Sequence, residues 1–104
     1  MAAEELRVAV QRLLTQVGHW EIGRWAASAG DGTRGDLVFG LIQRLADLSA
    51  AAERRTPRPV PREHDMILPD QLRVMTDDLL AAEAAEDLLR AAADDVLAVR
   101  KSLK

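Results

Sequence analysis

Apolar residues recur at every seventh position along the last third of the chain. Residues 70–104 contain no glycine or proline, and the repeat consists of Met75, Ala82, Leu89, Val96 and Leu103. This spacing places the apolar side chains on one side of a helix. The pattern therefore predicts a helix over residues 70–104, with an apolar stripe that another surface must cover.

The stripe weakens near Ala84. Residues 81–87 contain no large apolar side chain, and Glu86 stands where the repeat requires an apolar residue. Either one helix of about 50 Å continues through this segment, or the chain turns and a new helix begins with Glu86 and Asp87 in its acidic first turn. The pattern favours the continuous helix. Such a helix would extend beyond shorter neighbours and leave an apolar end for a second copy of the chain to cover.

Three shorter helices are predicted upstream by apolar residues at helical spacing. They cover about residues 4–17, 20–29 and 36–54. Gly18 interrupts the first helix, and Gly30 is a natural C-terminal cap for the second. A glycine-rich loop over residues 30–35 then leads to Asp36, which is well placed at the start of the third helix.

Residues 55–69 are predicted to form a strap between helices. Prolines at positions 57, 59 and 61 exclude a helix there and favour an extended, polyproline-like path. The apolar residues 66–68 return the strap to the core, and Pro69 suits the first turn of the last helix. The alternative to a spacer is a docking peptide, although such peptides usually have the spacing PxxP rather than PxPxP.

These elements predict an all-α fold, a small bundle of four helices, or five if the last one breaks, in one domain over residues 1–104. A chain of 104 residues can bury a sufficient core without a metal or a disulfide, and cysteine is absent. A reducing compartment, the cytoplasm, is the expected location. Arginine outnumbers lysine twelve to two and alanine occupies eighteen positions, a bias typical of GC-rich bacterial genomes.

Charge and hydropathy argue against two classes of partner. The longest apolar run, residues 37–42, is far shorter than the ~20 residues of a membrane-spanning helix, so no membrane association is expected. The net charge is −3, with no basic face and only Trp20, Trp25 and Phe39 as aromatic residues. A nucleic-acid partner is not expected either, since nucleic-acid binding requires basic patches and stacking platforms.

Catalytic chemistry has little support in this chain. There is no cysteine or tyrosine, the two histidines His19 and His64 are far apart, and no glycine-rich phosphate loop is present. We expect no cofactor and no catalytic residue. The alternative is a small metal-dependent hydrolase, similar to the all-α nucleotide pyrophosphatases. It would use the acids of the last helix, Glu83, Glu86 and Asp87, although no matching acidic motif occurs elsewhere.

The leading hypothesis is a protein-interaction or regulatory module that acts through helix faces, on a protein partner or on itself as a homodimer. Trp20 and Trp25 would lie about 140° apart on one helix, so we expect one of them to be partly exposed beside His19, as an interface anchor. Gly40 and Arg44 share a polar stripe of the third helix. Either another backbone crosses at Gly40, or a partner approaches there.

Overall fold

Four helices form the body of the molecule in the computed structural model, which describes residues 1–103. They are α1 (Ala2–Val17), α3 (Arg34–Ala52), α4 (Leu68–Ala81) and α5 (Glu86–Ser102). A short helix, α2 (Ile22–Trp25), and a two-stranded hairpin, β1 (Ser28–Ala29) and β2 (Gly32–Thr33), connect α1 to α3. One 3₁₀ turn, Asp65–Ile67, precedes α4. The predicted all-α bundle is confirmed.

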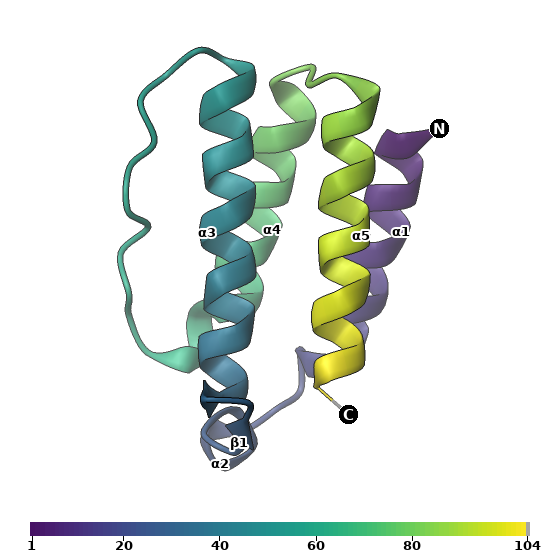
Figure 1. The fold of residues 1–104 in the computed structure, drawn as a ribbon. Helices are drawn as coiled ribbons and strands as arrows, with labels where there is room; N and C mark the ends of the chain where they lie inside the picture. Colours follow the sequence, from purple (N-terminus) through teal and green to yellow (C-terminus); the bar gives the residue numbers. More distant parts are fainter. Residues whose placement is uncertain (104) are drawn as a thin grey trace.

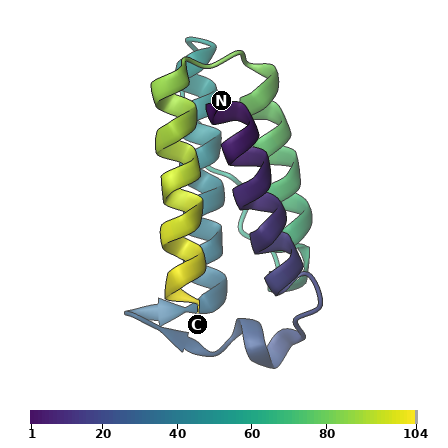
Figure 2. The same ribbon diagram turned by 90° about the vertical axis from the view of Figure 1, so that its right-hand side faces the viewer.

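The four helices form two parallel pairs that run in opposite directions (Figures 1 and 2). α1 packs most closely against α5, and α3 against α4. At one end of the first pair, the Ala2 N–H donates to Glu86 Oε2 over 3.1 Å, and at the other Arg100 Nε donates to Gln16 Oε1 over 3.1 Å. Fully buried side chains from all four helices fill the centre, among them Leu6, Leu13, Leu41, Leu45, Leu72, Leu79 and Val96.

An extended strap joins the parallel helices α3 and α4. It leaves the end of α3 and runs back along the outside of that helix to the start of α4 (Figure 1). The Gln43 side chain on α3 holds its backbone, since Nε2 donates to the Arg58 carbonyl over 3.0 Å and Oε1 accepts from the Val60 N–H over 2.7 Å. Val60 itself is buried. Of the apolar residues 66–68, Leu68 is buried whereas Met66 is exposed.

The favoured continuous helix over residues 70–104 is wrong, because the chain turns between Ala81 and Glu86. Glu83 adopts a left-handed backbone conformation with φ 52°, which ends the helix. A straight continuation through residues 81–87 would have no large apolar group to bury. The turn instead folds the second half of the stripe back onto the core, where Leu89, Val96 and Leu103 are buried. In residues 1–103, the extended apolar end expected of a continuous helix is therefore not present. Residue 104 lies outside the described residues.

The predicted helix over residues 20–29 is also wrong beyond its short central turn. α2 ends at Trp25, and residues 28–33 pair as a hairpin with Ser28 opposite Thr33 and Ala29 opposite Gly32. Gly30, expected to cap a helix, is the first residue of the two-residue hairpin turn and has φ 62°. Glycine adopts this conformation without steric cost and is favoured at that position of a hairpin turn.

In residues 1–103, none of the helices combines the length and the apolar character that a membrane crossing requires.

The helix break can be tested with two glycine substitutions, at positions 81 and 83. Glu83→Gly removes the side chain from a left-handed position, and we expect it to raise the free energy of unfolding by up to about 1 kcal/mol. Ala81→Gly, inside the last turn of α4, is expected to lower it by about 0.5 to 1 kcal/mol. Urea denaturation measures both. A continuous helix would instead make both substitutions destabilising.

Candidate functional site

The two tryptophans form one buried cluster at the hairpin end of the bundle. Their ring centroids lie 5.0 Å apart at an interplanar angle of 71°, an edge-to-face contact. The guanidinium groups of Arg24 and Arg34 lie 5.8 Å and 5.2 Å from the centre of the Trp20 ring. The expected exposure of one tryptophan is therefore wrong. Trp20 precedes α2 rather than belonging to it, so the 140° separation does not apply, and only His19 is exposed.

Arg44, one turn after Gly40 on α3, forms a separate contact with Asp95 of α5. Arg44 donates from Nε and Nη2 to the two carboxylate oxygens of Asp95, over 2.6 Å and 2.9 Å. These hydrogen bonds raise the pKa of the Arg44 guanidinium above its ordinary value. A side chain at Gly40 would meet Arg44 Nη1 at 3.2 Å. In residues 1–103, no backbone of another element comes within 4 Å of that position, so the expected backbone crossing at Gly40 is wrong. The bidentate pair with Asp95 makes Arg44 a link between helices, and Gly40 leaves room beside its guanidinium.

Two of the three acids of the alternative hydrolase hypothesis, Glu86 and Asp87, make contacts within the chain. Glu83 occupies the turn between α4 and α5, Glu86 accepts from the Ala2 N–H and lies 3.5 Å from Arg90, and Asp87 Oδ1 accepts from the Leu88 N–H. Within residues 1–103, no three histidine or carboxylate side chains are grouped so that they could hold a metal ion. The geometry offers no support for a hydrolytic metal centre.

A charged cluster at the start of α3 joins the hairpin to the strap. Thr33 caps α3, since its Oγ1 accepts from the Asp36 N–H, and its own N–H donates to Asp36 Oδ2. Arg62 of the strap lies 3.1 Å from both Asp36 and Asp65 and stacks over the Phe39 ring at 4.8 Å. The hydrogen bond from the Thr33 backbone is the main cause that lowers the pKa of Asp36. These contacts hold the chain in place rather than leaving a free site.

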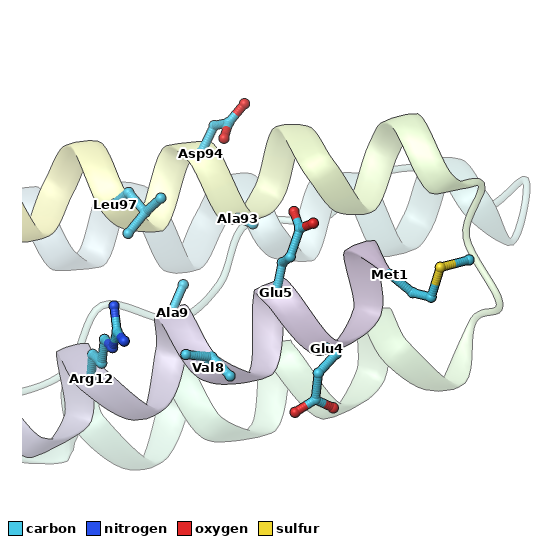
Figure 3. A pocket seen from close by; sticks show the side chains of 9 residues that line it. All are labelled: Met1, Glu4, Glu5, Val8, Ala9, Arg12, Ala93, Asp94 and Leu97. Atoms are coloured by element: carbon cyan, nitrogen blue, oxygen red, sulfur yellow. The ribbon is translucent and has the colours of Figure 1, made fainter.

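The feature that sequence reasoning missed is a groove between α1 and α5. It has a volume of about 340 Å³ and is flanked by the exposed side chains of Met1, Val8 and Leu97. Figure 3 shows Leu97 reaching from α5 toward α1, where Val8 and Arg12 lie. A second hollow of about 370 Å³ shares Val8 and Arg12 and extends to Arg100. We call the surface around both hollows the α1–α5 face.

A sequence signal for this face exists in the apolar residues that fall outside the core stripes. In α1 the stripe contains Leu6, Val10 and Leu13, and Val8 lies between its turns, on the opposite side. On α5, Leu97 directly follows the buried Val96 and likewise lies outside the stripe that faces the core. A search of the sequence for core stripes does not identify such residues, because a single exposed apolar residue is common on protein surfaces. Only the fold brings them together.

Comparisons with known protein families, with curated proteins and with solved structures find no match to this chain.

The role of Asp36 predicts a pH dependence of stability. Because its pKa is lower in the folded chain than the ordinary value of about 3.9, its contribution is present above that pH and is lost as the pH falls through the folded value. Asp36→Asn keeps the Thr33 cap but removes the charge. We expect the variant to be less stable than the natural chain at about pH 6, and the gap in melting temperature to close toward about pH 2. A gap that stays constant with pH would contradict this role.

Proposed function

We propose that the chain is a protein-interaction module and that the α1–α5 face is its binding surface. One observation carries the proposal. In residues 1–103, six large apolar side chains are exposed, and three of them, Met1, Val8 and Leu97, line the same groove. Exposed apolar residues are normally scattered singly, whereas a contiguous group flanked by polar residues is typical of an interaction site.

These three side chains lie outside the buried core of the bundle. Val8 and Leu97 are 41% and 39% exposed, while the neighbouring positions that face the core, such as Leu6 and Val96, are fully buried. The floor of the groove consists of the small residues Ala9 and Ala93. Small residues there let α1 and α5 approach closely and leave a shallow hollow that an apolar side chain of a partner can enter.

The edge of the groove has the composition of an interface rim. Glu4, Glu5, Asp94 and Arg12 surround the apolar side chains. Glu5 is paired with Arg90 of α5 over 3.2 Å, which ties the two helices together within the chain. A polar rim around an apolar centre is the usual organisation of protein interfaces. The tryptophans and His19, by contrast, are either buried or isolated at the far end of the bundle.

Stability measurements should separate this face from the core. We expect Val8→Glu and Leu97→Glu each to change the free energy of unfolding by less than about 0.5 kcal/mol, because both positions are exposed. Leu13→Glu, at a fully buried position of the same helix, should abolish folding. Circular dichroism with urea denaturation measures all three. A loss of several kcal/mol in Val8→Glu would show that the face belongs to the core.

The interaction itself can be tested by photo-crosslinking in cells that naturally produce the chain. A photoreactive phenylalanine analogue replaces Val8 or Leu97, and the matched control carries it at Val74, which is 52% exposed on α4. We expect adducts of defined mass from positions 8 and 97 and none from position 74. The absence of adducts at positions 8 and 97, or equal labelling at all three positions, would refute the proposed function.

A further inference from the structure

We propose that the α1–α5 face binds an amphipathic helix of another protein, which lies in the groove antiparallel to α1 and α5. This helix carries acids in its first turns and bases in its last turns. The inference rests on the proposed function and names the kind of partner. The shape of the groove, the main-chain groups of its walls and the distribution of charge along it support this choice.

The two hollows of the face form one channel about four helical turns long. Hydrogen bonds between α1 and α5 join residues whose numbers differ by 84 or 85, so Arg100 lies level with about residue 16 of α1. The side chains that line the hollows therefore extend from Met1 to that level. About 15 residues of helix rise about 22 Å. A partner helix of the same length fits along the channel.

The walls of the channel favour a helix over an extended segment. They are the sides of two α-helices, whose main-chain groups are hydrogen-bonded within each helix. An extended partner finds no main-chain ladder on such walls, whereas a helix satisfies its own N–H and C=O groups. The strap, which is extended, is held by the Gln43 side chain and is joined covalently to a helix at each end. A separate partner segment lacks that tether.

The exposed apolar side chains of the channel match the stripe of one helix. Val8 and Leu97 lie on opposite walls, level with residue 8 and about residue 13 of α1, and Met1 lies at one end (Figure 3). Met1 and Leu97 are separated along the axis by about 12 residues, or about 18 Å. Apolar residues at positions i, i+4, i+7 and i+11 of a helix cover about 17 Å on one face. Such a stripe reaches all three side chains.

Charge along the channel determines the direction of the partner helix. The acids that line it, Glu4, Glu5 and Asp94, lie level with residues 4 to about 10 of α1. The arginines, Arg12 and Arg100, lie level with residue 12 and about residue 16, and Figure 3 shows Glu4 and Arg12 toward opposite ends. Helices favour acids in the first turn and bases in the last. Such a helix meets opposite charges when it begins over the arginines and ends over the acids, which is the antiparallel direction. Exposed ion pairs add little affinity, but they determine orientation.

Selection from two peptide libraries tests the helix. Peptides of about 15 residues on an alanine-based scaffold, which favours a helix, are displayed on phage with random charged and apolar residues at the other positions. A matched library carries two central prolines, which exclude the helix. We expect the natural chain to select binders from the helical library alone. Val8→Glu should bind them at least about tenfold more weakly, and Val74→Glu should bind them like the natural chain.

Three results overturn the inference. They are binders from the proline library that depend on Val8, helical binders that bind Val8→Glu as tightly as the natural chain, and the absence of binders from both libraries.

An exchange of charges on α1 tests the direction of the helix. In residues 1–103, Arg12 makes no ion pair, and Glu4 pairs only with the exposed Arg7 at 3.6 Å. Glu4→Arg combined with Arg12→Glu therefore keeps the net charge and disturbs no buried contact. We expect the selected helices to carry acids first and bases last, and to bind this double variant at least about tenfold more weakly.

A peptide with the charge order of a selected helix reversed should bind the double variant more tightly than it binds the natural chain. Selected helices with bases first, or affinities that do not respond to the exchange, overturn the antiparallel direction.

The proposed function and this inference fail separately. Mass spectrometry of the adducts formed at positions 8 and 97 identifies the segment of the partner that lies on the face. Adducts to a loop or a strand, or to a second copy of this chain, remove the helix of another protein as the occupant and leave the proposed function standing.

Discussion

The parallel course of α3 and α4 is the constraint from which most of the architecture follows. Parallel neighbours cannot be joined by a short turn, so the connection must travel the whole length of α3. A helix of 19 residues spans about 28 Å. Residues 53–64, at about 3.1 Å per residue in a polyproline-like path, can cover about 37 Å. The alternate prolines supply that extended path, and a helix of the same length would be too short.

The same constraint gives the α1–α5 face its polarity. Since α4 runs with α3, the short turn that follows makes α5 antiparallel to α4 and parallel to α1. Acids at the start of a helix and bases at its end are favoured by the helix dipole, and α5 follows this rule with Glu86 and Asp87 at its start and Arg100 and Lys101 at its end. Because α1 and α5 are parallel, the change from acidic to basic side chains runs in the same direction along both helices. The directionality of the face therefore comes from local helix stabilisation combined with topology.

Strong periodicity made the long helices and the all-α fold predictable, and the prolines located the strap. The sequence was less informative where local and long-range effects compete. Alanine-rich residues 81–85 suit a helix by propensity, yet burial of Leu89 and Val96 requires a turn. Gly30 can cap the end of a helix or form a hairpin turn. The chain adopts the hairpin, in which each strand pairs only two residues. The predicted orientation of Trp20 was wrong because it assumed a helix that includes residue 20, whereas Trp20 precedes α2. The α1–α5 face could not be found from the sequence alone, because Val8 and Leu97 are separated by most of the chain.

Gln43 holds the strap through main-chain atoms alone, the carbonyl of Arg58 and the amide of Val60. The contact at position 58 therefore does not depend on which side chain stands there, and the Arg58 side chain is exposed. Residues in such a position can be exchanged without redirecting the chain. The strap is thus a natural graft point, where a recognition peptide or a fluorescent label can be displayed on a rigid helical support away from the groove.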